Sequence, residues 1–216
     1  MDSEALEQSA AILDQPSQDQ PSQTPILRYE NITNEAARSR LHEFLLQPGW
    51  RHGWKSNRRV DHYSFWNKHF AGSLDSSHEE DEFTGEIVDC SDELAQNYPL
   101  IHAFWTYLHK TVLRGHILVR CYANGYPYGT EGTVHTDASA STSYTSIFYP
   151  HDRWSPNWGG ETVFFNSDRS DLVASIYPKP NRLIVFPGAI PHAARGVSRV
   201  CPVLRVTLMF KTEHLG

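Results

Sequence analysis

The sequence has little cysteine, no long apolar run and no excess of positive charge, and each absence excludes a class of protein. Its three cysteines, Cys90, Cys121 and Cys201, are odd in number and widely spaced, which fits neither a disulfide framework nor a CxxC zinc site and indicates a reducing compartment. No apolar stretch approaches the roughly 20 residues that a membrane helix requires, and the first residues do not resemble a secretion signal. The formal net charge of -6 argues against a mainly electrostatic partnership with nucleic acid. We therefore expect a cytoplasmic protein that uses neither a membrane nor nucleic acid as its partner.

The composition changes near residue 25. Residues 1–25 are rich in Gln, Ser, Asp and Pro, and such a segment buries too little apolar surface to offset the entropy lost on ordering. We expect a disordered tail there, in which only Ala5 to Leu13 could form a short helix. No later stretch has the composition of a linker, so we expect residues 26–216 to form a single domain.

Two helical patterns precede a half of the chain that is rich in strands. The first places Ala37, Leu41, Phe44 and Leu45 on one face behind a capping Asn34. The second is a longer stripe, which we expect to be one helix packed on a sheet. Its members are Leu94, Tyr98, Ile101, Trp105, Leu108 and Val112.

After Gly115 the pattern becomes that of β-strands, with Gly and Pro in every gap. The expected strands are 117–122, 144–149, 161–165, 182–186 and 203–211. Helices followed by many short strands favour an α+β arrangement that is mainly β, with the helices backing a barrel-like sandwich. A Rossmann sheet is excluded, because no phosphate-binding glycine motif is present.

His135, Asp137 and His192 are the candidate metal ligands. His135 and Asp137 form the only His-x-Asp in the chain, and on extended backbone residues two apart point the same way, so both can reach one ion. Two imidazoles and one carboxylate on one face of Fe(II) leave positions open for a bidentate 2-oxo acid and dioxygen. The same set also suits zinc with a bound water, which keeps a hydrolase or lyase open as an alternative.

Arg205 is the candidate anion-binding residue. Alternation along the last strand puts Leu204, Val206 and Leu208 on a packing face and Arg205 on the opposite face. An inward guanidinium amid apolar strands is costly unless an anion meets it, and a carboxylate fits it best. Arg195 and Arg199 are alternatives, but their expected position in a loop favours Arg205.

The region from about 117 to 212 resembles the catalytic core of the prolyl hydroxylase group of Fe(II)/2-oxoglutarate dioxygenases. The matching features are Cys121-Tyr122, His135-x-Asp137, the strand from Thr145 to Tyr149, Gly159-Gly160-Glu161-Thr162, the segment from Pro178 to Phe186, Pro191-His192 and Arg205. The resemblance implies a double-stranded β-helix of the jelly-roll or cupin-like kind. It also implies Fe(II) and 2-oxoglutarate as cofactors, with ascorbate in support. By the same resemblance, Tyr122 and Tyr149 line the 2-oxoglutarate pocket, and Tyr149 shares the distal carboxylate with Arg205.

The resemblance implies that dioxygen and 2-oxoglutarate are consumed to oxidise a substrate C–H bond. The carboxylate of Asp137 favours hydroxylation over halogenation, while desaturation and cyclisation stay open. We expect a small metabolite or an amino-acid-like substrate, and a peptidyl proline is the alternative. A non-catalytic β-sandwich binding module with structural histidines is the alternative outside enzyme classes.

Aromatic and basic residues alternate between residues 50 and 70. Such a mixture can stack on bases and contact phosphates, but aromatic packing beneath a basic surface explains it better in an acidic protein. A third interpretation is that this segment forms a flap over the active site.

Overall fold

The computed structural model describes residues 26–56, 62–73 and 87–216, and the elements named below lie within these ranges. In chain order they are β1 (Leu27–Tyr29), α1 (Glu35–Leu46), β2 (Arg51–Trp54), β3 (Phe65–Gly72), α2 (Ser91–Asn97), α3 (Pro99–Thr111), β4 (His116–Tyr126), β5 (Ser143–Tyr149), a 3-10 turn η1 (Pro156–Trp158), β6 (Thr162–Phe165), β7 (Leu172–Ile176), β8 (Arg182–Pro187), β9 (His192–Ala194) and β10 (Arg205–His214).

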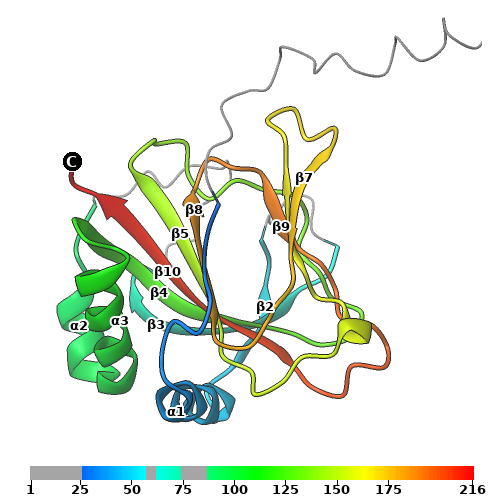
Figure 1. The fold of residues 1–216 in the computed structure, drawn as a ribbon, viewed down its shortest axis with the longest axis horizontal. Coiled ribbons are helices and arrows are strands. Elements are labelled where there is room, and N and C mark those ends of the chain that lie inside the picture. Colours follow the sequence, from blue (N-terminus) through cyan, green and yellow to red (C-terminus); the bar gives the residue numbers. More distant parts are fainter. Residues whose placement is uncertain (1–25, 57–61, 74–86) are drawn as a thin grey trace, which may run out of the picture.

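The strands form two antiparallel sheets that face each other. The large sheet has the order β1-β8-β5-β10-β4-β3-β2, and the small sheet has the order β7-β6-β9 (Figure 1). Side chains from the inner faces of both sheets, including Tyr122, Phe164, Phe186 and Met209, form one of the two buried apolar clusters. This arrangement confirms the predicted double-stranded β-helix, mainly β with helices added.

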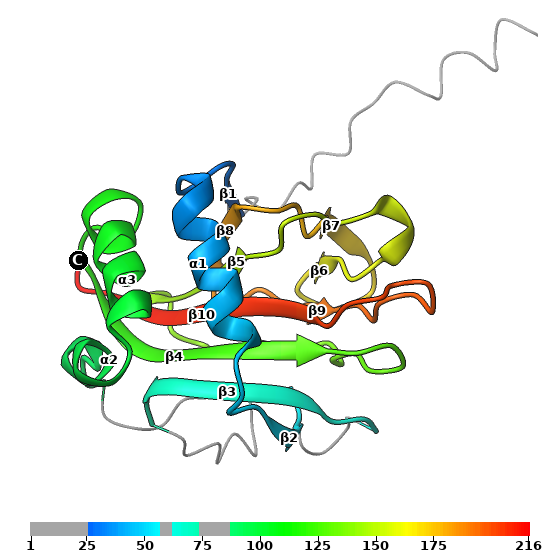
Figure 2. The ribbon, with the colours of Figure 1, turned by 90° about the horizontal axis from the view of Figure 1, so that it is seen from below.

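The helices cover the outer face of the large sheet, which confirms the prediction that helices back the sandwich (Figure 2). The larger apolar cluster lies between them, and it joins Leu41 and Leu45 of α1 to Phe148, Leu208 and other residues of the sheet. Helix α1 begins where the sequence predicts, because the side chain of Asn34 accepts a hydrogen bond from the backbone N–H of Ala37 at 2.8 Å.

The prediction of a single helix from Leu94 to Val112 was wrong. The chain forms two helices there, α2 and α3, and Tyr98 between them has φ -138° and ψ 66°. The cause is Pro99, which disfavours helical backbone at the residue before it and opens the second helix as its first residue. The apolar side chains of both helices still face the sheet, so the stripe predicted packing correctly and continuity wrongly.

All five predicted strands are present, with ends that differ by a few residues. Strand β10 has the predicted phase: Val206, Leu208 and Phe210 pack in the helix-side cluster, whereas Met209 packs between the sheets. Arg205 therefore faces the space between the two sheets. The short strands β1, β2, β7 and β9 and the longer β3 were not predicted, because each lacks a clear alternation of its own and depends on a paired neighbour.

The expected tail and the short helix within it lie outside the described residues. Within the described parts of the sequence, no helix is long and apolar enough to cross a membrane. Residues of the aromatic and basic segment form β2 and β3, and the ring of Phe65 stacks on Tyr126 of β4 at 4.3 Å between centroids. Stacking of this kind is the packing that we expected for the segment.

Candidate metal centre and adjoining pocket

Direct backbone pairing brings the two histidines together. The N–H of His135 donates to the carbonyl of His192 at 3.0 Å, and the N–H of His192 donates to the carbonyl of His135 at 2.9 Å. Their rings lie 4.5 Å apart between centroids. Residues that are far apart in sequence thus share one position on the inner surface because β9 pairs with the segment that carries His135.

Asp137 is fixed by its own backbone and by two polar neighbours. Its N–H donates to the carbonyl of Gly188 at 2.8 Å, next to the end of β8. The hydroxyl of Thr145 donates to Oδ2 at 2.6 Å, and the ammonium of Lys211 forms an ion pair with the same oxygen. Lys211 also donates to Thr145 at 3.0 Å, so β5 and β10 together orient the carboxylate.

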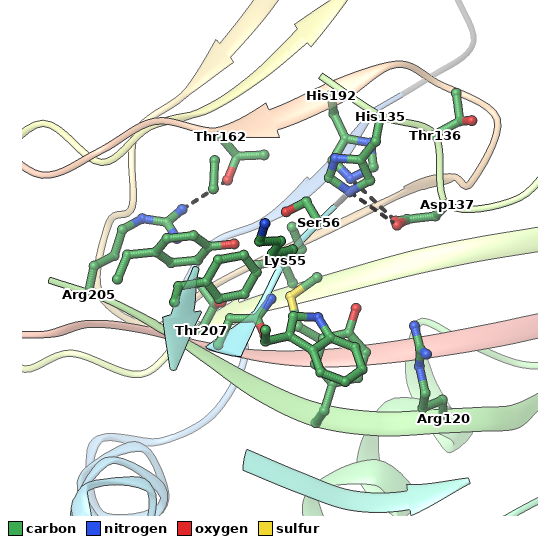
Figure 3. A pocket seen from close by; sticks show the side chains of 18 residues that line it. Lys55, Ser56, Arg120, His135, Thr136, Asp137, Thr162, His192, Arg205 and Thr207 are labelled. Atoms are coloured by element: carbon green, nitrogen blue, oxygen red, sulfur yellow. Dashed lines mark hydrogen bonds and ion pairs between the residues drawn. The ribbon is translucent and has the colours of Figure 1, made fainter. Parts of the chain in front are cut away.

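The three side chains are arranged as a metal site requires. One ligand atom from each of His135, Asp137 and His192 lies within 4.8 Å of the others. Nε2 of His135 is 3.5 Å from Oδ1 of Asp137, and Nε2 of His192 is 3.3 Å from Oδ2 (Figure 3). Two nitrogens and one oxygen on one side of a common point match the facial set that Fe(II) oxygenases use.

Backbone carbonyls hold both imidazoles in the tautomer that a metal needs. Nδ1 of His135 is 2.9 Å from the carbonyl of Thr133, and Nδ1 of His192 is 2.9 Å from the carbonyl of Ile190. A carbonyl only accepts, so each Nδ1 must carry the proton, and each Nε2 is left with a free lone pair that faces Asp137.

The pKa values of these groups follow from burial and from their mutual charges. Burial alone would raise the pKa of Asp137, but the nearby ammonium of Lys211 is the largest opposing influence, and that pKa lies well below its usual value. Burial lowers the pKa of His192. For His135 the nearby carboxylate outweighs burial and raises the pKa. The centre therefore holds an ionised Asp137 and a neutral His192 at neutral pH.

A pocket adjoins this centre and ends at Arg205. Its lining includes the three candidate ligands, Arg205 and Tyr122. Arg205 is only 1% exposed, and among the described residues no carboxylate forms an ion pair with it. A buried, unpaired guanidinium that faces a pocket is a site for an anion supplied from outside.

Neighbours orient the guanidinium of Arg205. Its Nε donates to the carbonyl of Gly160 at 2.5 Å, and its Nη2 donates to Oγ1 of Thr162 at 3.1 Å. Cζ lies 5.8 Å from the ring centre of Tyr149, whose hydroxyl is hydrogen-bonded to Thr162 at 2.7 Å. Burial raises the pKa of Tyr149 against the opposing charge of Arg205, so the phenol stays protonated. Only two of the five N–H donors of Arg205 are used in these contacts.

The structure thus places the predicted residues His135, Asp137, His192 and Arg205 around one pocket. Tyr122 lines the pocket, as expected. Tyr149 does not: it is fully buried behind the pocket, and its hydroxyl is hydrogen-bonded to Thr162 instead of facing the place of a distal carboxylate. The alternative cations Arg195 and Arg199 are exposed and do not line the pocket, and Arg195 lies over the ring of Phe165.

Sequence reasoning missed other residues of the site. Thr145 and Lys211 could have been found, since Lys211 continues the inward phase of Arg205, Thr207 and Met209 along β10. Lys55 and Ser56 line the pocket just after the end of β2, and nothing in the sequence indicates that they lie there. The remaining lining residues that were not predicted are Trp54, Phe65, Arg120, Asn124, Tyr126, Thr136, Ile147, Thr162, Ala194, Thr207 and Met209.

Comparison with known proteins agrees with this geometry. Residues 119–210 match the family model of the 2OG-Fe(II) oxygenase superfamily. A search of curated protein sequences found no significant match.

Solved structures share the fold at low sequence identity. A 2OG-Fe(II) oxygenase family oxidoreductase from Burkholderia pseudomallei has a TM-score of 0.63 and 14% identity, over 88% of this chain and 85% of that one. A prolyl-4-hydroxylase from Pseudomonas putida has a TM-score of 0.56 and 14% identity, over 90% and 95%. A prolyl hydroxylase from Trichoplax adhaerens, in complex with a hypoxia inducible factor peptide fragment, has a TM-score of 0.56 and 11% identity, over 89% and 84%.

The superfamily implies Fe(II) and 2-oxoglutarate as cofactors, and the residues present fit both. Two imidazole nitrogens and one carboxylate oxygen are suitable ligands for Fe(II), and the buried guanidinium of Arg205 is a suitable partner for a carboxylate of a dicarboxylic acid. The part of the sequence that carries the three candidate metal ligands and Arg205, residues 119–210, is therefore the part that matches the family model of the 2OG-Fe(II) oxygenase superfamily.

Proposed function

We propose that this protein is a 2-oxoglutarate-dependent hydroxylase in which His135, Asp137 and His192 bind Fe(II) and Arg205 binds the distal carboxylate of 2-oxoglutarate. Residues 26–216 would act as one catalytic unit. The observation that carries the proposal is the convergence of all four side chains on one pocket between the two sheets. When bound, Fe(II) and 2-oxoglutarate supply the oxidising chemistry. One oxygen atom of O2 enters the substrate as hydroxyl, and the other enters the succinate that forms with CO2.

The protein's own residues position and protect these groups. The carbonyls behind His135 and His192 keep each Nε2 available to the metal, and Thr145 and Lys211 hold the carboxylate of Asp137 in place. Arg205 fixes the far end of the co-substrate and Tyr149 orients Arg205 through Thr162, while Tyr122 lines the pocket opposite Met209. Lys55 and Ser56 close the pocket from the side of β2.

The first experiment is an anaerobic titration of the apoprotein with Fe(II) and 2-oxoglutarate. A chelated 2-oxo acid gives a visible charge-transfer band, which should appear in the wild type and be lost in Asp137→Ala. His102→Ala is a matched control, because His102 lies on α3 and does not line the pocket. Absence of the band in the wild type, or tight binding of zinc with hydrolytic activity, would contradict the proposal.

We propose a small metabolite or amino-acid-like molecule as the substrate. In support, charged side chains line the pocket besides the candidate metal ligands, namely Lys55, Arg120 and Arg205. Succinate formation should be measured against a panel of small acids, free amino acids and proline-containing peptides. Stimulation by peptides alone would favour the alternative of a peptidyl-proline hydroxylase.

A further inference from the structure

A second hollow adjoins the metal centre on the side away from Arg205. Arg120 and Asp137 line both this hollow and the larger pocket, and Lys211 and Glu213 line the second one alone. On β10, Arg205 and Lys211 are six residues apart, which is about 20 Å of extended strand. Figure 3 likewise shows Arg120 and Arg205 at opposite ends of the pocket. A 2-oxoglutarate molecule held by Arg205 and the metal therefore cannot also reach Arg120.

Arg120 has unused hydrogen-bonding capacity. Its Cζ lies 4.8 Å from the ring centre of Tyr122, and within the described residues its guanidinium forms no hydrogen bond or ion pair. Lys211 stands opposite Arg120 in the β4–β10 pairing, but its ammonium is already neutralised by Asp137. An anion that enters this hollow thus meets Arg120 as its free partner, in a fork geometry that fits a carboxylate.

Glu213 offers the opposite charge in the same hollow. Its side chain is buried, with 8% of the residue exposed, and Ser143 donates a hydrogen bond to Oε1. No described residue donates to Oε2. A buried carboxylate oxygen without a donor is costly, and an ammonium group brought by a ligand would satisfy it.

The strand geometry places these two groups at one end of the barrel. Lys211 and Glu213 are two residues apart on β10 and share its inner face, and Arg120 lies across from Lys211 on β4. On the basis of the proposed function, we propose that this hollow binds the substrate, and that the substrate is a small zwitterion of the α-amino acid type. Its carboxylate binds Arg120 and its ammonium binds Glu213. Because Asp137 lines the same hollow, a C–H bond beyond the α-carbon of such a substrate comes close to the metal position.

The test begins with a step that separates this inference from the proposed function. Fe(II) and 2-oxoglutarate are first titrated anaerobically into the wild type, and failure at this step contradicts the function itself. Succinate formation is then measured with the proteinogenic amino acids, with their amides, which lack the carboxylate, and with their N-acetyl derivatives, which lack the ammonium. We expect at least one free amino acid to stimulate turnover, with a KM at least about tenfold lower than that of either derivative, as one charge-assisted hydrogen bond implies.

Two variants connect each preference to one residue. Arg120→Met should abolish the preference for the free acid over the amide while keeping the preference for the free amine. Glu213→Gln should do the reverse. A general folding defect would not separate the two preferences in this way. Arg153→Met, at an exposed position that lines neither hollow, should leave both preferences unchanged.

The inference is overturned if 2-oxoglutarate binds but no free amino acid stimulates turnover. It is equally overturned if a stimulating amino acid shows the same preferences in Arg120→Met and Glu213→Gln as in the wild type.

Discussion

Replacement of Arg205 by Met removes the cation that the proposed 2-oxoglutarate pocket depends on and keeps a side group of similar length. In the structure, Arg205 is 1% exposed and uses two N–H donors on Gly160 and Thr162. Three donors remain to meet a carboxylate in the pocket. Loss of these bonds should weaken 2-oxoglutarate binding without moving the metal ligands, because Arg205 lies at the far end of the pocket from Asp137 (Figure 3).

The size of the effect follows from the type of bond. Hydrogen bonds to charged groups contribute about 1.5–3 kcal/mol each, so the loss of a bidentate pair costs about 3 kcal/mol or more. This corresponds to a rise in the Kd for 2-oxoglutarate of about a hundredfold or more. The affinity for Mn(II), a metal probe that is stable in air, should change by less than about threefold.

The assay compares 2-oxoglutarate with 2-oxobutyrate, which chelates a metal in the same way but has no distal carboxylate. The wild type should bind 2-oxoglutarate about a hundredfold more tightly, and Arg205→Met should bind the two acids equally. Arg199→Met is the matched control, since Arg199 is exposed and outside the pocket. If Arg205→Met keeps the wild-type preference for 2-oxoglutarate, Arg205 does not bind the distal carboxylate and its proposed role is wrong.

Three further predictions follow from the surroundings of the site. Lys211→Met should destabilise the apoprotein by about 1–3 kcal/mol, because Asp137 loses its ion pair, and should enlarge the rise in Tm on addition of Mn(II); an unchanged Tm in both states would contradict this. His151 is buried, its Nε2 accepts the N–H of Val206, and burial lowers its pKa to about 3. Since an unfolded histidine takes up a proton near pH 6.5, this contribution to stability is complete above that pH and is lost as the pH falls towards 3, by about 2 kcal/mol at pH 5. Denaturant unfolding of the wild type and His151→Gln at pH 7.5 and pH 5 should show a weaker acid dependence in the variant, and equal slopes would refute the assignment. Gly160→Ala should lower both the Tm and the affinity for 2-oxoglutarate, because φ of Gly160 is +80° and a Cβ there would lie 2.9 Å from the buried side chain of Arg205. If neither quantity changes, the backbone at Gly160 can shift without cost and the prediction is wrong.

Strand alternation predicted the inward face of β10 because that strand is long and Val206, Leu208 and Phe210 make its packing face apolar. Arg205 lies on that inward face, and three further steps of two residues along the strand reach Lys211. Strand alternation could not predict the pairing of His135 with His192. That contact depends on β9, a strand of three residues whose existence is decided by its neighbour β6 and not by its own sequence.

The prediction of one continuous helix from Leu94 to Val112 failed for a different reason. Periodicity records which residues face the sheet, and Leu94 and Ile101 do so in two separate helices. The backbone at Tyr98 is set by the following proline, whose steric effect overrides the stripe. A pattern of apolar residues therefore predicts a buried face more reliably than it predicts an unbroken element.

Arg120 is a pocket residue that simple strand alternation does not predict. Strict alternation from Leu118, which packs in the helix-side cluster, would turn Arg120 toward that same cluster and away from the pocket. The β4–β10 pairing, however, is irregular: Lys211 stands opposite Arg120, and the next residue, Thr212, stands opposite Leu118. The extra residue on β4, Val119, shifts the phase, so Leu118 and Cys121 both face the helices and Arg120 faces the pocket. A β-bulge thus converts what the sequence presents as a misplaced charge in a core strand into a cation beside the metal centre. A variant that lacks Val119 should pair regularly and keep Arg120 on the pocket side, because Leu118, Arg120 and Cys121 then alternate, and it should keep the preference for free amino acids over their amides. If the variant folds but loses that preference as Arg120→Met does, the phase shift at Val119 is not what places this charge.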